Sequence, residues 1–361
     1  MRWTILLMRS QLSSHRIVAE KKEKKMTNVF RDKNILVIGG SGSIGSEIVR
    51  KVLQYEPKVV RVLSNDENGL FNLEQELQTY SNLRFLVGDV RDKERLQRAV
   101  ENIQLVFHAA ALKHVPLCEY NPFEAAKTNV LGTQNVIEAA MEEGVEKLIT
   151  ISTDKAVSPI NVMGATKLLA ERLTISANYY KGFSKTAFSC VRFGNVLGSR
   201  GSALPLFRKQ IENGGPVTLT DPNMTRFVMS ISKAVELVFK AAKVAHGGEI
   251  FVLKMPALRI GELAEVMIEE LAAQYGYRPE QIKVEIIGKR PGEKYDEELM
   301  TEEEAKYAYE TQDMFVILPK AIGDHSRVKK KARIHYTSTD QPLLTKQQIK
   351  VLLQEIAECP V

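Results

Sequence analysis

Short apolar runs alternate with longer amphipathic segments along the chain from Lys33 to about residue 200. The runs of strand length are NILVIGG, VVRVLS, LRFLVGD, LVFHAA and KLITIST. Between them lie segments with helical periodicity, such as SIGSEIVRKVLQ, NGLFNLEQELQTY, KERLQRAVE, EAAKTNVLGTQNVIEAAMEEG and GATKLLAERLTISANYY. Alternation of this kind predicts an α/β fold, a Rossmann-type doubly wound parallel sheet with helices on both faces.

The pattern changes after about residue 200, where loops rich in glycine and proline appear, such as GGPVTLTDPNMTRF. Short strands and helices lie between these loops, and FVLKMP has the composition of another buried strand. We therefore expect a basic tail at 1–30, a dinucleotide-binding domain at 31–200 and a smaller lobe at 201–361. This lobe would bind substrate, and some of its segments would return to the main sheet.

The composition, 44% hydrophobic and 26% charged over 361 residues, is that of an ordinary globular protein. Its net charge of +6 comes from residues 1–33, which carry nine Lys and Arg against three Asp and Glu. The rest of the chain has no net charge, which argues against a nucleic-acid partner. No uncharged apolar run reaches the ~18 residues of a membrane span, so we expect none. Met26 offers an alternative start of translation.

Cysteine and histidine give no sign of a metal site. The three cysteines, Cys118, Cys190 and Cys359, have no metal-ligand spacing, and sparse cysteine is typical of a reducing compartment. We therefore expect a cytoplasmic location. His108 and His114 lack a third ligand nearby, and we expect no metal.

Gly39, Gly42 and Gly45 form a GxxGxxG pattern in VIGGSGSIGSEIV, between a predicted strand and a predicted helix. A Cβ at these positions would hold a pyrophosphate away from the helix N-terminus, whose free N–H groups and dipole favour an anion. The turn therefore predicts a dinucleotide site that includes Ser43 and Ile44. A plain strand-to-helix turn is the alternative interpretation.

The end of the next strand should select between NAD and NADP, since a carboxylate there pairs with the ribose hydroxyls of NAD. The sequence offers Ser64, Asn65 and Asp66, and the residue at the strand tip depends on where the strand ends. The expected cofactor is therefore NADP or NAD. Asp89, followed by Val90, ends the third predicted strand, where it would meet the adenine or alternatively cap the next helix.

Seven motifs appear in order along the chain: GGSGSIGS, FHAAALKHVPLCEYNPFEAAKTNVLGTQNV, STDKAV, NVMGATK, RFGNVLGSRGS, DPNMTRF and RPGEK. Together they resemble the extended short-chain dehydrogenase/reductase superfamily, and within it the polysaccharide-biosynthesis 4,6-dehydratases of UDP-N-acetylglucosamine. The match runs from about Lys33 to Pro319. The resemblance implies conversion of UDP-N-acetylglucosamine to a UDP-4-keto-6-deoxy-hexosamine, a tightly bound and recycled NAD or NADP, and a homo-oligomer.

The stretch STDKAVSPINVMGATK carries the expected chemistry. Dehydration needs a base for the C5 proton and an acid for the departing 6-hydroxyl. The resemblance makes Asp154 the acid and Lys155 the base, with Thr153 on the 4-hydroxyl and Lys167 on the nicotinamide ribose. Burial or the nearby Lys167 would lower the pKa of Lys155 and help it to be neutral for part of the cycle, while Asp154 would oppose this effect. Met163 stands where the superfamily usually has a tyrosine, so we expect Asp154 or a bound water to take the 4-hydroxyl proton.

The matching motifs also imply further site residues. Ala109, Lys113 and Asn129 are expected beside the cofactor. A UDP diphosphate needs cations, for which guanidinium groups are suited, and Arg200 and Arg226 lie in polar loops of the second lobe. The complete expected substrate set is Lys113, Asn195, Arg200, Ser202, Arg226 and Glu293.

Two other functions stay open at this point. One is a UDP-sugar 4-epimerase, which would be expected to keep the tyrosine that Met163 replaces. The other is a catalytically silent dinucleotide sensor, which would have no need for an acid–base pair together with two arginines. Inversion at C5 also stays open, although the motifs fit inverting dehydratases slightly better.

Overall fold

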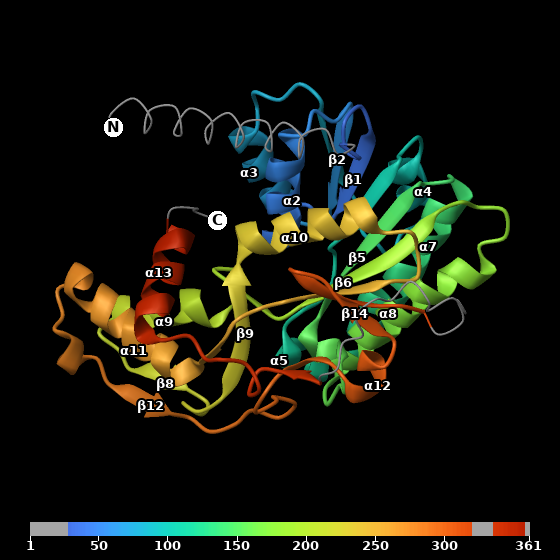
Figure 1. The fold of residues 1–361 in the computed structure, drawn as a ribbon. Coiled ribbons are helices and arrows are strands. Elements are labelled where there is room, and N and C mark those ends of the chain that lie inside the picture. Colours follow the sequence, from blue (N-terminus) through green and yellow to red (C-terminus); the bar gives the residue numbers. More distant parts are fainter. Residues whose placement is uncertain (1–27, 320–334, 358–361) are drawn as a thin grey trace, which may run out of the picture.

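The computed structural model describes residues 28–319 and 335–357. Residues 1–27 of the predicted tail, including Met26, lie outside these ranges, as does Cys359. Figure 1 shows a large α/β body and a smaller lobe beside it, which carries helices α9, α11 and α13.

A nine-stranded sheet forms the centre of the described chain, in the order β14-β15-β10-β6-β5-β4-β1-β2-β3 (Figure 1). The seven strands from β10 to β3 pair in parallel, and β15 and β14 extend one edge by antiparallel pairing. The predicted Rossmann-type doubly wound sheet is confirmed. Its strands are β1 (Asn34–Ile38), β2 (Val59–Ser64), β3 (Leu83–Val87), β4 (Leu105–His108), β5 (Lys147–Thr153), β6 (Ala187–Phe193), β10 (Ile250–Leu253), β14 (Ala308–Glu310) and β15 (Met314–Ile317).

Helices cover both faces of the sheet because successive side chains of a strand point to opposite sides. On β1, Ile35 and Val37 belong to the core shared with α2, α3 and α10, whereas Leu36 and Ile38 belong to the core shared with α4, α7 and α8. Full burial of each such side chain stabilises the fold by about 1.5–3 kcal/mol. These helices are α2 (Ser43–Leu53), α3 (Glu67–Glu76), α4 (Lys93–Val100), α7 (Gly132–Glu142), α8 (Val162–Tyr180) and α10 (Ile231–Val244).

Most elements predicted before residue 200 are confirmed, and β2 and β5 have the predicted bounds. The predicted helical segment at 124–144 consists of three pieces, the end of α6 (Pro122–Ala125), a π-helical turn at Ala126–Leu131, and α7. The buried strand β6 is absent from the predicted runs. Its sequence, AFSCVRF, includes a buried arginine that a simple apolar pattern does not anticipate.

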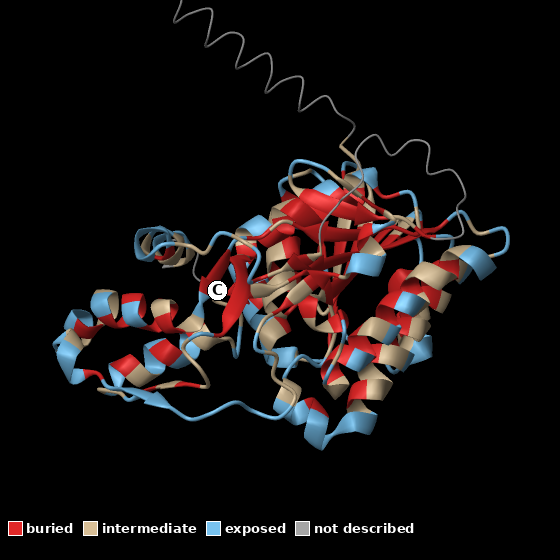
Figure 2. Ribbon diagram, turned by 60° about the horizontal axis from the view of Figure 1, so that its bottom comes forward, coloured by how far each residue is buried: buried red, intermediate tan, exposed pale blue. Residues whose placement is uncertain are grey.

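The smaller lobe has its own apolar core, which includes Phe207, Leu263 and Ile349. Its helices are α9 (Ala203–Glu212), α11 (Ile260–Leu271) and α13 (Lys346–Ala357), and its strands β8 (Val217–Leu219) and β12 (Val284–Ile286) pair in parallel. Figure 2 shows buried residues continuing from the main sheet into the region of β9, whereas β12 is exposed. The lobe therefore sits on a buried three-stranded connection, β11 (Ala257–Arg259), β9 (Thr225–Ser230) and β7 (Asn195–Leu197).

The remaining short elements lie around the junction of the two parts. β13 (Glu298–Met300) pairs with β16 (Tyr336–Thr337), and α12 (Glu302–Ala305) follows β13 directly. α5 (Val115–Tyr120) precedes α6 along the chain.

Candidate active site

The glycine-rich turn between β1 and α2 has the geometry of an anion cradle. Gly39 has φ +79°, and a Cβ there would lie 2.6 Å from the backbone nitrogen of Ala110. A Cβ on Gly45 would lie 2.1 Å from the carbonyl oxygen of Gly39. α2 begins at Ser43 with Gly42 as its N-cap, so no side chain caps this helix in the described structure. Its first N–H groups suit an anion for that reason.

A cavity of about 230 Å³ opens beside this turn, at the carboxyl ends of the parallel strands. Nucleotides bind at this edge of open α/β sheets, and the small residues of the turn leave room for a phosphate to approach the backbone. These residues therefore fit a dinucleotide. The predicted cofactor residues in the lining are Gly39, Gly42, Ser64, Asn65, Asp66, Asp89, Val90 and Ala109.

Asn129 lies behind the wall of the cavity, in the π-helical turn. Its side chain accepts from the N–H of Leu112 at 2.8 Å and donates to the Leu112 carbonyl and the Thr166 hydroxyl, both at 3.0 Å. Asn129 therefore fixes the loop that carries the cavity residue Leu112 against α8. Its direct contact with a cofactor stays a prediction.

The tip of β2 is occupied by Ser64, whose hydroxyl lies 2.7 Å from that of Ser41. Asp66 instead caps α3, because its side chain accepts from the N–H of Gly69 at 3.0 Å. The strand tip therefore carries a small hydroxyl and no carboxylate, which leaves space for the 2′-phosphate of NADP as well as for NAD.

Asp89 lines the cavity as an ionised carboxylate. It accepts from Arg91 at 2.8 Å and from the amide of Asn65 at 3.1 Å, and the hydrogen bond from Arg91 lowers the pKa of Asp89 to about 2. The alternative prediction, that Asp89 caps the next helix, is wrong. Asp92 caps α4, accepting from the N–H of Arg95 at 2.9 Å.

Arg200 reaches the cradle from the loop after β7. Its guanidinium donates to the carbonyl of Ser41 and pairs with Asp66 at 3.2 Å, while its backbone N–H donates to the hydroxyl of Ser43 at 3.0 Å. Lys113 donates to the carbonyl of Arg200. These contacts form a strap from the second part of the chain over the dinucleotide turn.

Replacing Arg200 by alanine is expected to speed dinucleotide loss about twofold to fivefold, because an exposed ion pair is worth up to ~1 kcal/mol. The measurement is the fraction of bound dinucleotide that survives repeated gel filtration. Arg208→Ala, which changes an exposed arginine on α9, is the matched control. Equal retention by both variants would contradict a strap function.

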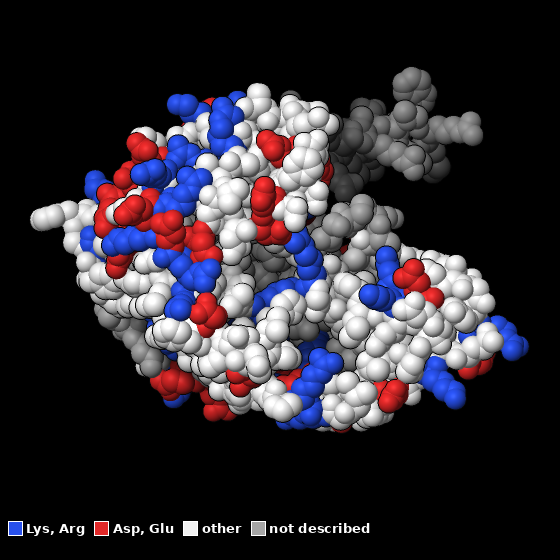
Figure 3. All heavy atoms as spheres, turned by 180° about the vertical axis from the view of Figure 1, so that it is seen from behind, with Lys and Arg blue, Asp and Glu red and all other residues white. Residues whose placement is uncertain are grey.

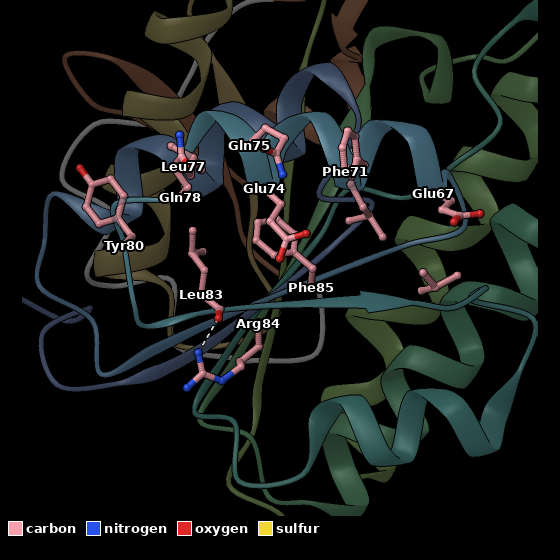
Figure 4. A pocket seen from close by; sticks show the side chains of 12 residues that line it. Glu67, Phe71, Glu74, Gln75, Leu77, Gln78, Tyr80, Leu83, Arg84 and Phe85 are labelled. Atoms are coloured by element: carbon pink, nitrogen blue, oxygen red, sulfur yellow. Dashed lines mark hydrogen bonds between the residues drawn. The ribbon is translucent and has the colours of Figure 1, made fainter.

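A larger hollow of about 630 Å³ lies between α3 and the edge strand β3 (Figure 4). Phe71 and Phe85 belong to its lining, and Arg84 donates to the backbone carbonyl of Leu83 at 2.6 Å. Its lining shares no residue with the cradle, and it brings together no buried acid–base pair within the described chain. The candidate active site is therefore the smaller cavity and the cluster described next.

Thr153, Asp154 and Lys155 lie where β5 runs into a short 3₁₀ turn. Asp154 is fully buried, and its Oδ1 accepts from the Thr153 hydroxyl at 2.8 Å and from Lys155 Nζ at 3.0 Å. Its Oδ2 has no hydrogen-bond partner among the residues that the structure describes. A free carboxylate oxygen beside a cation can take up and release a substrate proton.

Glu297, which the motifs do not single out, lies directly before β13 and is 2% exposed. Its Oε1 is 3.1 Å from Lys155 Nζ, and Asn195 Oδ1 accepts from the same nitrogen at 3.4 Å. The sequence gives little signal for this residue, since an acidic run such as DEE is typical of a solvated loop.

Lys155 is protonated in this environment. Burial by itself would lower the pKa of Lys155, but the carboxylates of Asp154 and Glu297 outweigh burial and raise that pKa above its ordinary value. The predicted opposition of Asp154 is confirmed, and together with Glu297, which the sequence did not single out, it outweighs the predicted effect of burial in the resting structure.

Met163 and Lys167 are both buried and lie one turn apart on α8. Met163 packs with Cys118 and Ala125, so it fills apolar space. Lys167 donates to the carbonyl of Ile151 at 2.6 Å, and burial lowers the pKa of Lys167. Its contact with a nicotinamide ribose stays a prediction.

Arg226 on β9 turns its guanidinium into the protein. It pairs with Glu293 at 3.3 Å, donates to the Tyr295 carbonyl at 2.9 Å and lies 3.9 Å from Glu297. Arg200 and Arg226 therefore belong to two different clusters here, the cradle and the acid–base group. Their contact with a diphosphate stays a prediction.

Lysine and arginine side chains gather around the hollow between the two lobes (Figure 3).

Ser202 occupies the N-cap of α9, and its hydroxyl has no hydrogen-bond partner in the described ranges. His108, at the end of β4, lies 3.0 Å from the Thr133 hydroxyl, and burial lowers the pKa of His108 to about 3. No group of three potential metal ligands occurs among residues 28–319 and 335–357.

The fold and the site define an extended short-chain dehydrogenase/reductase of the nucleotide-sugar dehydratase and epimerase class. Its features are the doubly wound parallel sheet, the glycine-rich turn at α2 and the Asp-Lys pair beside a Met-x-x-x-Lys helix. The model of the family described as polysaccharide biosynthesis protein matches residues 35–319, and the chain belongs to this family. The solved structure of Pen from Bacillus thuringiensis is 49% identical, with a TM-score of 0.85 over 90% of this chain and 98% of that chain.

Three curated relatives match most of the chain. The uncharacterized membrane protein MJ1061 of Methanocaldococcus jannaschii is 63% identical over 92% of this chain and 98% of that protein. An inverting UDP-N-acetylglucosamine 4,6-dehydratase of Campylobacter jejuni is 39% identical over 87% and 95%. A UDP-glucose 4-epimerase of Rickettsia rickettsii is 39% identical over 90% and 96%. Within the described part of this chain, no helix has the length and apolar character that crossing a membrane requires.

Proposed function

We propose that this protein is a UDP-N-acetylglucosamine 4,6-dehydratase with a tightly bound NAD or NADP. The observation that carries the proposal is the buried Asp154 at a carboxyl end of the sheet, whose Oδ1 pairs with Lys155 Nζ at 3.0 Å and whose Oδ2 has no hydrogen-bond partner among the described residues. The dehydratase of Campylobacter jejuni adds support through its 39% identity. A homo-oligomer in the cytoplasm, serving polysaccharide or glycan synthesis, belongs to the same proposal.

The residues divide the chemistry between two proton routes. Bound NAD or NADP would accept a hydride from C4 of the sugar and return it to C6. Asp154 takes the proton of the 4-hydroxyl and passes it to the 6-hydroxyl, which leaves as water. Lys155 takes the C5 proton and later returns a proton to C5. Thr153 orients Asp154, and Met163 holds no proton, so the usual tyrosine step falls to Asp154.

The second candidate function is a UDP-sugar 4-epimerase, which the epimerase of Rickettsia rickettsii favours at the same level of identity. An epimerase would leave the 6-hydroxyl in place and needs no acid for it. The acid–base pair of Asp154 and Lys155 therefore favours dehydration. A silent dinucleotide sensor would not require this buried pair at all.

Proton NMR of the purified protein with UDP-N-acetylglucosamine in D₂O tests the proposal. Three samples are compared, one without added cofactor, one with NAD and one with NADP. We expect a 4-keto-6-deoxy sugar that carries deuterium at C5, already in the sample without added cofactor. The couplings of its hydrated form report retention or inversion at C5. A C4 epimer with an intact 6-hydroxyl would establish the epimerase, and an unchanged spectrum with all three samples would contradict both enzymes.

A further inference from the structure

Glu297 is a buried carboxylate that takes no part in the two proton routes assigned above to Asp154 and Lys155. Its Oε1 lies 3.1 Å from Lys155 Nζ, and its Oε2 has no hydrogen-bond partner in residues 28–319 and 335–357. The side chain of Lys155 is 24% exposed and that of Glu297 is 2% exposed. Lys155 therefore reaches the open side of the site, and Glu297 lies behind it.

The backbone holds Glu297 firmly in this place. Its N–H donates to the Ser338 hydroxyl at 2.9 Å, and its carbonyl accepts from the N–H of Ser338 at 2.8 Å. Two residues along, the carbonyl of Leu299 accepts from Arg192 at 2.9 Å. A backbone fixed in this way keeps the carboxylate within reach of one nitrogen, as repeated proton exchange requires.

The resting ammonium poses a problem for the C5 step. Nζ of Lys155 carries its full set of protons between Asp154 and Glu297, so it has no lone pair with which to take H5. Asp154 is engaged with the 4-hydroxyl and 6-hydroxyl proton in the proposed function. The remaining acceptor within reach of Nζ is Glu297, because Asn195 offers an amide oxygen that does not take up a proton.

We propose that Glu297 is a positioning and proton-storing residue, which accepts one proton from Lys155 so that Lys155 acts as a neutral base at C5. This inference rests on the proposed function. Nζ passes a proton to Oε1, and its freed lone pair takes H5. The electron pair of the C5–H bond forms the C5–C6 double bond as the C6–O6 bond breaks. After Nζ has returned a proton to C5, Glu297 gives its stored proton back to Nζ.

The charges around the pair agree with this exchange. Burial and the negative charge of Asp154 raise the pKa of Glu297, while Lys155 and Arg226 oppose that rise. Asp154 on the 3₁₀ turn and Arg226 on β9 are the other charged groups at the pair, and Asn195 on β7 is neutral. A carboxylate with a raised pKa holds a proton more readily than an ordinary one, as storage requires.

The test compares Glu297→Gln with the wild-type protein and with Glu298→Gln. Glu298 is the next residue on the chain, but it binds His335 at 2.6 Å and Ser158 at 2.8 Å, away from Lys155. We expect Glu297→Gln to lower kcat near neutral pH about 100-fold with KM changed less than threefold, since positioned proton transfer contributes about 10²–10⁴-fold. Glu298→Gln should stay close to wild type.

Two readouts separate proton storage from a structural role. In Glu297→Gln, the isotope effect on kcat with substrate deuterated at C5 should rise, because H5 removal becomes rate-limiting. The kcat of this variant should also increase with pH, as solvent replaces the missing acceptor, while the wild-type kcat stays flatter. Glu297→Asp should recover part of the rate.

The outcomes are distinguishable from failure of the proposed function. If the wild-type protein forms no 4-keto-6-deoxy sugar, the proposed function is contradicted, and this inference with it. The inference alone is overturned if the wild type is active and the Glu297→Gln variant is equally fast, with an unchanged isotope effect. Circular dichroism would establish that this variant is folded. A slow variant with an unchanged isotope effect and an unchanged pH profile assigns Glu297 a merely structural role.

Discussion

Replacing Asp154 by asparagine is expected to lower the turnover of UDP-N-acetylglucosamine by about 10³-fold, within the range that positioned acid–base groups contribute. Asparagine keeps the shape of the side chain and can still accept from Thr153 and Lys155, which bind Oδ1 at 2.8 and 3.0 Å. It cannot take up the 4-hydroxyl proton or deliver it to the 6-hydroxyl. Binding of the UDP-sugar, measured by calorimetry, should change less than threefold.

Asp313→Asn is the control for this experiment. Asp313 also pairs with a lysine, Lys240 at 2.8 Å, but its side chain is 30% exposed and lies outside the acid–base cluster. We expect its turnover to match wild type. Near-normal turnover by Asp154→Asn would show that a bound water or another group carries the 4-hydroxyl proton, and Asp154 would lose its assigned role.

Replacing Arg192 by methionine is expected to destabilise the protein by about 3–5 kcal/mol, because it leaves the buried carboxylate of Glu171 unpaired. Arg192 on β6 is completely buried and pairs with Glu171 of α8 at 2.7 Å and with Glu304 of α12 at 2.9 Å. The midpoint of thermal unfolding should fall by about 10 °C for a domain of this size.

The double variant Arg192→Met with Glu171→Gln separates charge from packing. Neutralising Glu171 removes the unpaired buried charge, so we expect the double variant to recover a large part of the lost stability. Equal midpoints for the single and double variants would show that the loss comes from packing instead. The same ion pair also matters for the site, since Arg192 holds the carbonyl of Leu299 near Glu297.

The sequence predicted those strands and helices whose local pattern agrees with their tertiary environment. β2 and β5 were predicted with their observed bounds because a parallel strand buried on both faces is a continuous apolar run. β6 was not, because its Arg192 is buried only through two carboxylates from other elements. The sequence offered Asp89 as a possible cap of the next helix, but α4 begins at Lys93 and is capped by Asp92.

The sequence by itself determined the doubly wound sheet, the glycine turn and the Asp154–Lys155 pair, since each depends on residues close together in the chain. The tertiary structure decided the state of that pair. Glu297 reaches Lys155 from a distant segment and helps to keep it protonated, and Arg226 pairs with Glu293 in the same group. The charge of a buried group depends on burial and on neighbours that the fold brings together, and spacing along the chain specifies neither.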